Sequence, residues 1–164
     1  MSELTARQTF EIREALKRDA AELLGRMLFE FSHLDVNLGL CVVWTDNGQR
    51  INELTRQTVD SSFHKKLDYL SQRVDSAFKK GSKEHSAYTE WIALAHELRN
   101  QRNQLVHGRW GIDPIQGHVI NLTGLPTSSD QKEVRYSLSE LRNVIEDLIR
   151  LQTNLSEISE RWPL

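Results

Sequence analysis

The chain has 164 residues, of which 38% are hydrophobic and three are proline, so it is long enough for one domain with a sizeable core. Its 21 basic and 23 acidic side chains give a formal net charge of −2. This balance excludes a histone-like polycation and an acidic disordered chain.

Cys41 is the one cysteine, which excludes an intramolecular disulfide and a multi-cysteine metal site. The longest apolar run, residues 38–44, is far shorter than the ~20 residues that a membrane-spanning helix needs. Residues 1–30 are charged throughout and contain no secretory signal. We therefore expect a cytoplasmic protein with no membrane partner.

The first part of the chain predicts long helices. Residues 2–45 contain no proline and place apolar side chains at steps of three and four, which indicates one long helix or two nearly continuous ones. Asp46-Asn47-Gly48 is a turn sequence that ends it. The same periodicity predicts a second helix through residues 59–78, with Gly81 after it, and a third over about 84–106, closed by Gly108.

Residues 108–136 interrupt the helical pattern, because they hold four of the eight glycines and two of the three prolines. Their alternating segments predict a β-hairpin or an ordered loop, with a return strand near residues 133–136. A last helix follows, with Ser137 or Ser139 as its N-cap. The prediction for residues 1–164 is a single all-α domain: an up-and-down bundle of four or five helices with this small insertion before the last helix.

One arginine of the third predicted helix lies on the wrong face. At about 100° per residue, Arg102 falls about 20° from Trp91, inside an apolar stripe. That stripe contains Trp91, Leu94, Ala95, Leu98 and Leu105. An unpaired buried guanidinium costs several kcal/mol, so we expect Arg102 to be paired, to reach a cleft or to lie at an interface.

The segment Arg102-Asn103-Gln104-Leu105-Val106-His107 resembles the signature of the HEPN superfamily of helical domains. That signature is an arginine, then a polar residue, then a histidine after four to six intervening residues near a helix C-terminus. Many members are metal-independent endoribonucleases that act as dimers. The resemblance implies an RNA-cleaving homodimer, plausible as a toxin or phage-defence effector, with an antitoxin or regulatory protein as a further partner.

The residue types in this segment suit RNA cleavage, in which the substrate's own 2′-OH is the nucleophile. His107 can act as acid or base near neutral pH, and the fork of Arg102 matches two phosphate oxygens. Asn103 would orient the histidine or donate to the phosphate. Arg99 and Arg109 flank the segment and are candidates for holding the RNA backbone.

No cofactor and no metal site are expected. His96 and His107 are ~16 Å apart along a helix, and neither has a second ligand one turn further on. Simpler roles remain open: His107 as a favourable charge at a helix C-terminus, Arg102 in a structural ion pair, and Trp110 as a packing residue. The alternative function is a non-catalytic helical module for dimerisation or for binding a protein, nucleotide or nucleic acid.

Overall fold

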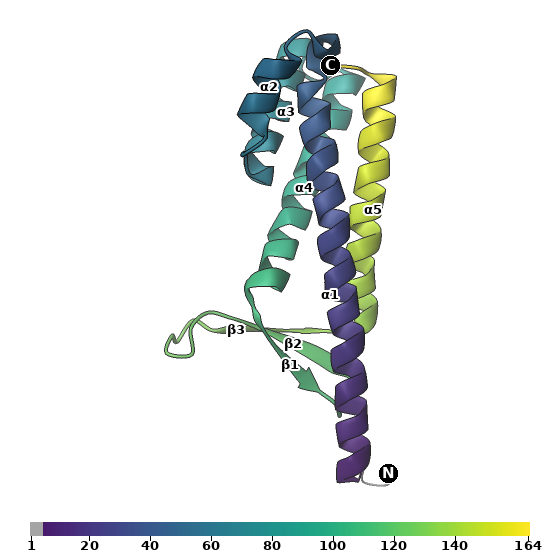
Figure 1. The fold of residues 1–164 in the computed structure, drawn as a ribbon, viewed down its shortest axis with the longest axis vertical. Coiled ribbons are helices and arrows are strands. Elements are labelled where there is room, and N and C mark those ends of the chain that lie inside the picture. Colours follow the sequence, from purple (N-terminus) through teal and green to yellow (C-terminus); the bar gives the residue numbers. More distant parts are fainter. Residues whose placement is uncertain (1–4) are drawn as a thin grey trace. The chain divides into compact units, whose positions relative to one another are not determined.

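The structure is a computed structural model that describes residues 5–164. It is mainly helical, with a small antiparallel sheet inserted before the last helix (Figure 1). Both features confirm the sequence prediction. The elements in chain order are α1 (Ala6–Val43), the 3-10 turn η1 (Thr45–Gly48), α2 (Ile51–Thr58), α3 (Phe63–Ala77), α4 (Lys83–His107), β1 (Arg109–Asp113), β2 (His118–Thr123), β3 (Lys132–Tyr136) and α5 (Leu138–Arg161).

The chain divides into two compact units. Unit 1 comprises the residues up to Phe29 and Asn100–Glu146, and unit 2 comprises Glu30–Arg99 and Asp147–Leu164. The sheet therefore belongs to unit 1, and α2 and α3 belong to unit 2. Helices α1, α4 and α5 each contribute residues to both units.

Helix α1 is a single continuous helix and ends where the turn sequence was predicted. Asp46, Asn47 and Gly48 all have positive φ, at 57°, 53° and 73°. Left-handed backbone cannot continue an α-helix, and these three residue types tolerate it best. A Cβ at position 48 would also lie 2.9 Å from the Trp44 ring, so a larger residue there would have to displace that exposed ring.

The prediction of one helix through residues 59–78 is wrong in its first part. Residues 59–62 separate α2 from α3, and Val59 is 69% exposed rather than part of a buried stripe. The Ser62 side chain accepts a hydrogen bond from the Lys65 amide at 3.3 Å and so caps a new helix. A cap satisfies an amide that the first helical turn leaves unpaired, which favours starting α3 here.

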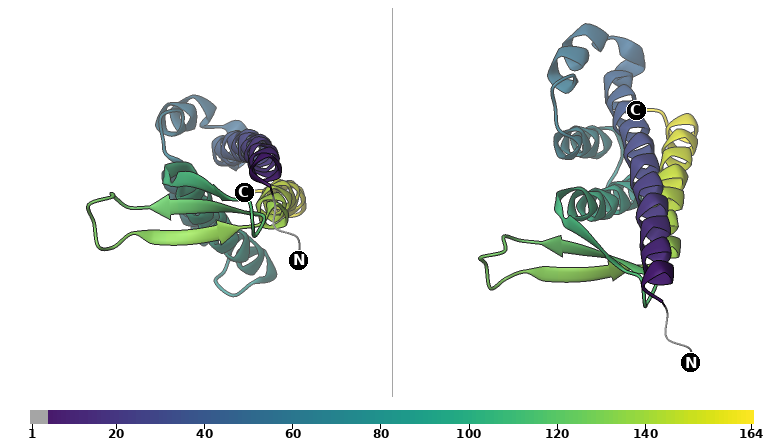
Figure 2. Two further views of the ribbon diagram at one scale, coloured as in Figure 1. Left: turned by 90° about the horizontal axis from the view of Figure 1, so that it is seen from below. Right: turned by 60° about the horizontal axis from the view of Figure 1, so that its bottom comes forward.

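The insertion forms a three-stranded sheet in the order β1-β2-β3, one strand more than a hairpin (Figure 2). Both pairings are antiparallel: Trp110 lies opposite Asn121, and Asn121 lies opposite Val134. The alternation in β2 buries Val119 and Asn121. The predicted return strand is confirmed as β3.

Helix α5 starts at a capping box, as the sequence predicted with Ser137. The Ser137 hydroxyl accepts from the Glu140 amide at 3.2 Å, and the Glu140 carboxylate accepts from the Ser137 amide at 2.7 Å. This arrangement satisfies two amides at the start of the helix. Ser139 is therefore not the cap.

Each unit buries its own apolar side chains. In unit 1 these include Leu23, Met27, Leu105, Val119, Leu141 and Ile145, and in unit 2 they include Leu34, Leu38, Leu67, Leu70, Tyr88, Trp91, Leu148 and Leu151. The polar atoms of the two buried aromatic residues are satisfied: Trp91 donates to the Leu151 carbonyl and Tyr88 to the Trp162 carbonyl. Leu94, predicted on the buried stripe, is instead 50% exposed.

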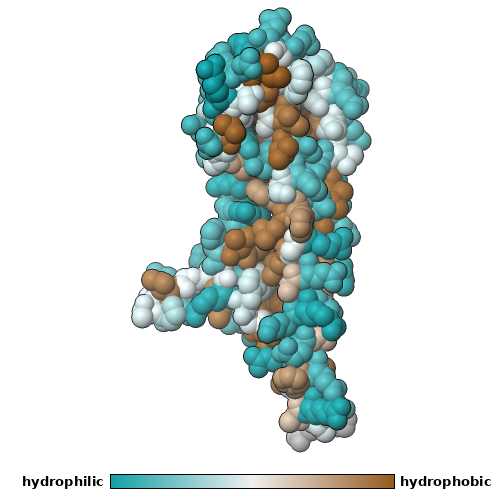
Figure 3. Space-filling model, viewed as in Figure 1, coloured by the Kyte–Doolittle hydropathy of each residue, from teal (hydrophilic) through white to brown (hydrophobic). Residues whose placement is uncertain are grey.

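The viewed surface is mostly hydrophilic with separate apolar patches (Figure 3). Exposed apolar side chains are normal on a folded protein, so these patches alone indicate no partner. None of the helices in residues 5–164 combines the length and the apolar character needed to cross a bilayer.

Candidate functional site

The HEPN-like segment occupies the last turns of α4 and lies in unit 1. The helix ends at His107, Gly108 still donates to the Gln104 carbonyl at 3.2 Å, and β1 starts at Arg109. His107 is exposed and makes no hydrogen bond or ion pair with any residue between 5 and 164. Its imidazole is therefore available to a ligand.

Arg102 is half-buried, and its guanidinium is held by the neighbouring side chain. Its Nη1 donates to Asn103 Oδ1 at 3.0 Å. Two of the three predicted catalytic residues, which are neighbours in the sequence, therefore contact each other. It also gives Asn103 a task not named in the sequence analysis, because its amide oxygen orients the arginine rather than the histidine.

The two predicted RNA-backbone residues differ in their surroundings. Arg109 is exposed at the first position of β1, next to the end of α4. Arg99 is half-buried on α4, in unit 2, where its charge contributes to lowering the pKa of His96. Arg109 is the better placed of the two to contact a ligand at the end of α4.

Asn121 is a residue of this region that sequence reasoning missed. It is 1% exposed, and its side chain packs so closely over Gly108 that no Cβ would fit there. Its Nδ2 has no hydrogen-bond partner among the described residues. Only the register of β2 against β1 places this amide beside the end of α4, so no sequence signal could have found it.

Trp110 packs within unit 1, in agreement with the simpler of its possible roles. Its Nε1 donates to the Leu105 carbonyl at 3.0 Å, and its ring lies 6.0 Å from the ring of Tyr136. The exposed side of the residue lines a pocket of about 490 Å³ between α1 and the sheet. Arg13 and Lys17 of α1 line the same pocket, so it combines apolar and cationic walls.

Cys41 is not a candidate nucleophile. Burial raises the pKa of its thiol to about 11, and the thiolate is the nucleophilic form of cysteine. The thiol therefore stays protonated near neutral pH.

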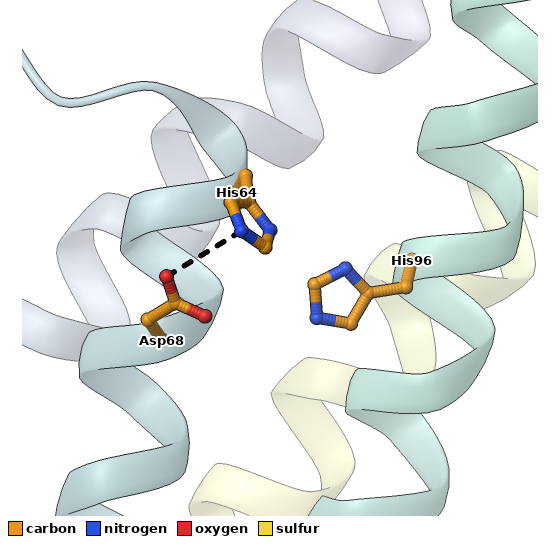
Figure 4. Close-up of side chains that lie close together, drawn as sticks. All are labelled: His64, Asp68 and His96. Carbon is orange, nitrogen blue, oxygen red and sulfur yellow. Dashed lines mark ion pairs between the residues drawn. The ribbon is translucent and has the colours of Figure 1, made fainter.

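A second group of chemically competent side chains lies in unit 2 (Figure 4). His64 and Asp68 project from α3 and His96 from α4, and one ligand atom from each lies within 4.8 Å of the others. Partial burial lowers the pKa of His96, and the charges of His64 and Arg99 lower it further. His64 and Asp68, which are one helical turn apart on α3, were not among the metal ligands considered from the sequence, which were His96 and His107.

Comparison of the chain with family models, with curated proteins and with solved structures finds no match.

Proposed function

We propose that this chain is a metal-independent endoribonuclease of the HEPN type, which cleaves RNA through the 2′-OH at a site built by two copies of the chain. One observation carries the proposal. On the last two turns of α4, Asn103 holds the half-buried guanidinium of Arg102, while the imidazole of His107 is exposed and makes no hydrogen bond or ion pair with residues 5–164. An oriented cation and an available acid–base group are what this reaction requires.

In the proposed reaction, one His107 accepts the proton of the 2′-OH as the 2′-oxygen attacks phosphorus. The bond from phosphorus to the 5′-oxygen breaks, and His107 of the second copy protonates this leaving oxygen. The products are a 2′,3′-cyclic phosphate and a 5′-hydroxyl. Arg102 donates to the non-bridging oxygens, where negative charge accumulates in the transition state.

The homodimer follows from the two proton transfers, since each chain supplies a single His107. Arg109, exposed beside the end of α4, would hold the RNA backbone, and Arg99 would contribute a more distant charge. The pocket lined by Trp110, Arg13 and Lys17, also in unit 1, would offer a place for a base and its phosphate. The same proposal includes an up-and-down bundle and a cytoplasmic location. It also includes a role as a toxin or phage-defence effector that is controlled by an antitoxin or regulator.

The test is incubation of labelled RNA with the full chain in EDTA. We expect wild type to cleave, and Arg102→Ala and His107→Ala each to lose at least about 100-fold in rate, the scale of acid–base and charge stabilisation. Asn103→Ala should lose less, because the arginine remains. RNA with a 2′-deoxy nucleotide at the cleaved position should stay intact, and the product should carry a 2′,3′-cyclic phosphate.

His33→Ala is the matched control, because His33 is a histidine on α1 whose side chain is 64% exposed. It should cleave like wild type. Melting temperatures check folding, and that of His107→Ala should be unchanged because the residue is exposed and has no side-chain partner among the described residues. Equal cleavage by wild type and both motif variants, or an inert wild-type protein, would refute the proposal and favour a non-catalytic binding or dimerisation module.

A further inference from the structure

We propose that His64, Asp68 and His96 bind one divalent transition-metal ion of the zinc class. The site is separate from the proposed RNA-cleaving site: these residues belong to unit 2, whereas Arg102, Asn103 and His107 belong to unit 1. The metal-binding proposal does not rest on the proposed nuclease function.

The backbone places the three side chains for a shared ligand (Figure 4). His64 and Asp68 are four residues apart on α3, so they project from the same face one turn from each other. His64 Nε2 lies 3.7 Å from Asp68 Oδ2. The His96 ring comes from α4 and meets the His64 ring edge-on, with centroids 5.2 Å apart.

The spacing is close to that of a bound metal. Zinc–nitrogen and zinc–oxygen bonds of about 2.0–2.1 Å in a tetrahedral site put neighbouring ligand atoms roughly 3.3 Å apart. The three ligand atoms lie within 4.8 Å of one another. Side-chain rotations that move these atoms by about an ångström would bring them to the spacing of a bound zinc ion. The side chains of His64 and Asp68 are 54% and 49% exposed, which leaves them room to rotate.

The donor set selects the class of ion. Two imidazole nitrogens and one carboxylate oxygen suit zinc and its first-row neighbours, whereas magnesium and calcium prefer oxygen ligands throughout. Three protein ligands leave a fourth position for water, as in zinc sites that are not purely structural. The ion would join α3 to α4 within unit 2.

The local charge is mixed. Asp68 supplies one negative charge, while Arg99 lies near enough to His96 to affect its pKa and would repel the ion. Removing that cation should therefore strengthen binding, which gives a variant that acts in the opposite direction from loss of a ligand.

The test is titration of zinc chloride into the full chain after removal of metals with EDTA and dialysis, followed by calorimetry. We expect one ion per chain. His64→Ala and His96→Ala should each weaken binding by at least about tenfold, as should Asp68→Asn, and Arg99→Gln should tighten it. His33→Ala should bind like wild type. Cobalt(II) in place of zinc should give visible ligand-field bands that disappear in His64→Ala.

Circular dichroism without metal checks that each variant is folded. His64→Ala decides the outcome if His96→Ala fails to fold, because the His64 side chain is the more exposed of the two. Zinc affinity of His64→Ala equal to that of His33→Ala, or no zinc uptake by wild type, would overturn the site. RNA cleavage in EDTA bears only on the nuclease proposal, so either proposal can fail without the other.

Discussion

Gly108 is the residue at which α4 becomes β1, and the space beside its Cα is filled. The side chain of Asn121, itself 1% exposed, occupies the position that a Cβ would take. The glycine therefore lets the strand approach the end of the helix that carries His107. The need for glycine at position 108 comes from this packing and not from a positive φ, because Gly108 is not among the glycines with left-handed backbone.

Gly108→Ala should lower the stability of the protein by about 1–3 kcal/mol, the usual cost of forcing extra atoms into a packed region. Thermal or urea unfolding measures the change. Asn121→Ala in the Gly108→Ala background should recover most of the loss, because it removes the overlapping amide together with an Nδ2 that has no described partner. An unchanged melting temperature for Gly108→Ala would contradict this account.

At the scale of elements, one carboxylate joins the turn after α1 to the residue that precedes α2 and to α3. Asp46 Oδ2 accepts from Arg50 Nη2 at 3.0 Å, and Asp46 Oδ1 lies 2.6 Å from Nη2 of Arg73 on α3. The hydrogen bond from Arg50, followed by the charge of Arg73, lowers the pKa of the Asp46 carboxyl below its ordinary value. Two arginines thus fix a turn in which Asp46 itself has left-handed backbone.

The lowered pKa sets the direction of a pH dependence. A carboxyl with a lower pKa in the folded state stabilises the protein above its unfolded pKa, about 3.9, and loses that effect as the pH falls through the folded value. Wild type should therefore be more stable than Asp46→Asn near neutral pH, and the gap in melting temperature should narrow below about pH 4. A difference in melting temperature that stays constant down to about pH 2 would show that the charge of Asp46 does not contribute to stability.

At the scale of the whole molecule, the proposed reaction needs more than one chain. The described chain supplies one His107 and one Arg102–Asn103 pair, whereas the reaction uses an acid and a base. A site shared by two copies requires a closed, two-fold arrangement, the commonest form of homo-oligomer.

Dilution tests this requirement directly. Specific RNA-cleaving activity should fall once the protein concentration drops below the dissociation constant of the dimer, because monomers lack the second histidine. Analytical ultracentrifugation over the same concentrations supplies that constant independently. Specific activity that stays constant while the dimer dissociates would place both proton transfers within one chain.

Much of the fold could be predicted because helices and turns depend on local sequence. The long α1, the turn at Asp46, the insertion and the Ser137 cap all follow from residues within a few positions of one another. The break before α3 was missed because the apolar steps continue through Val59 and Phe63, although Ser62 is a recognisable cap. There, a local capping signal outweighed a longer-range periodicity.

The sequence by itself determined the mainly helical class, the place of the insertion before the last helix and the candidate residues Arg102, Asn103 and His107. Only the tertiary structure decided that Asn121 packs over Gly108 and that His64 and Asp68 meet His96. The reason is physical. Periodicity and capping act over one or two turns, whereas strand register and helix packing bring together residues whose separation along the chain carries no local signal.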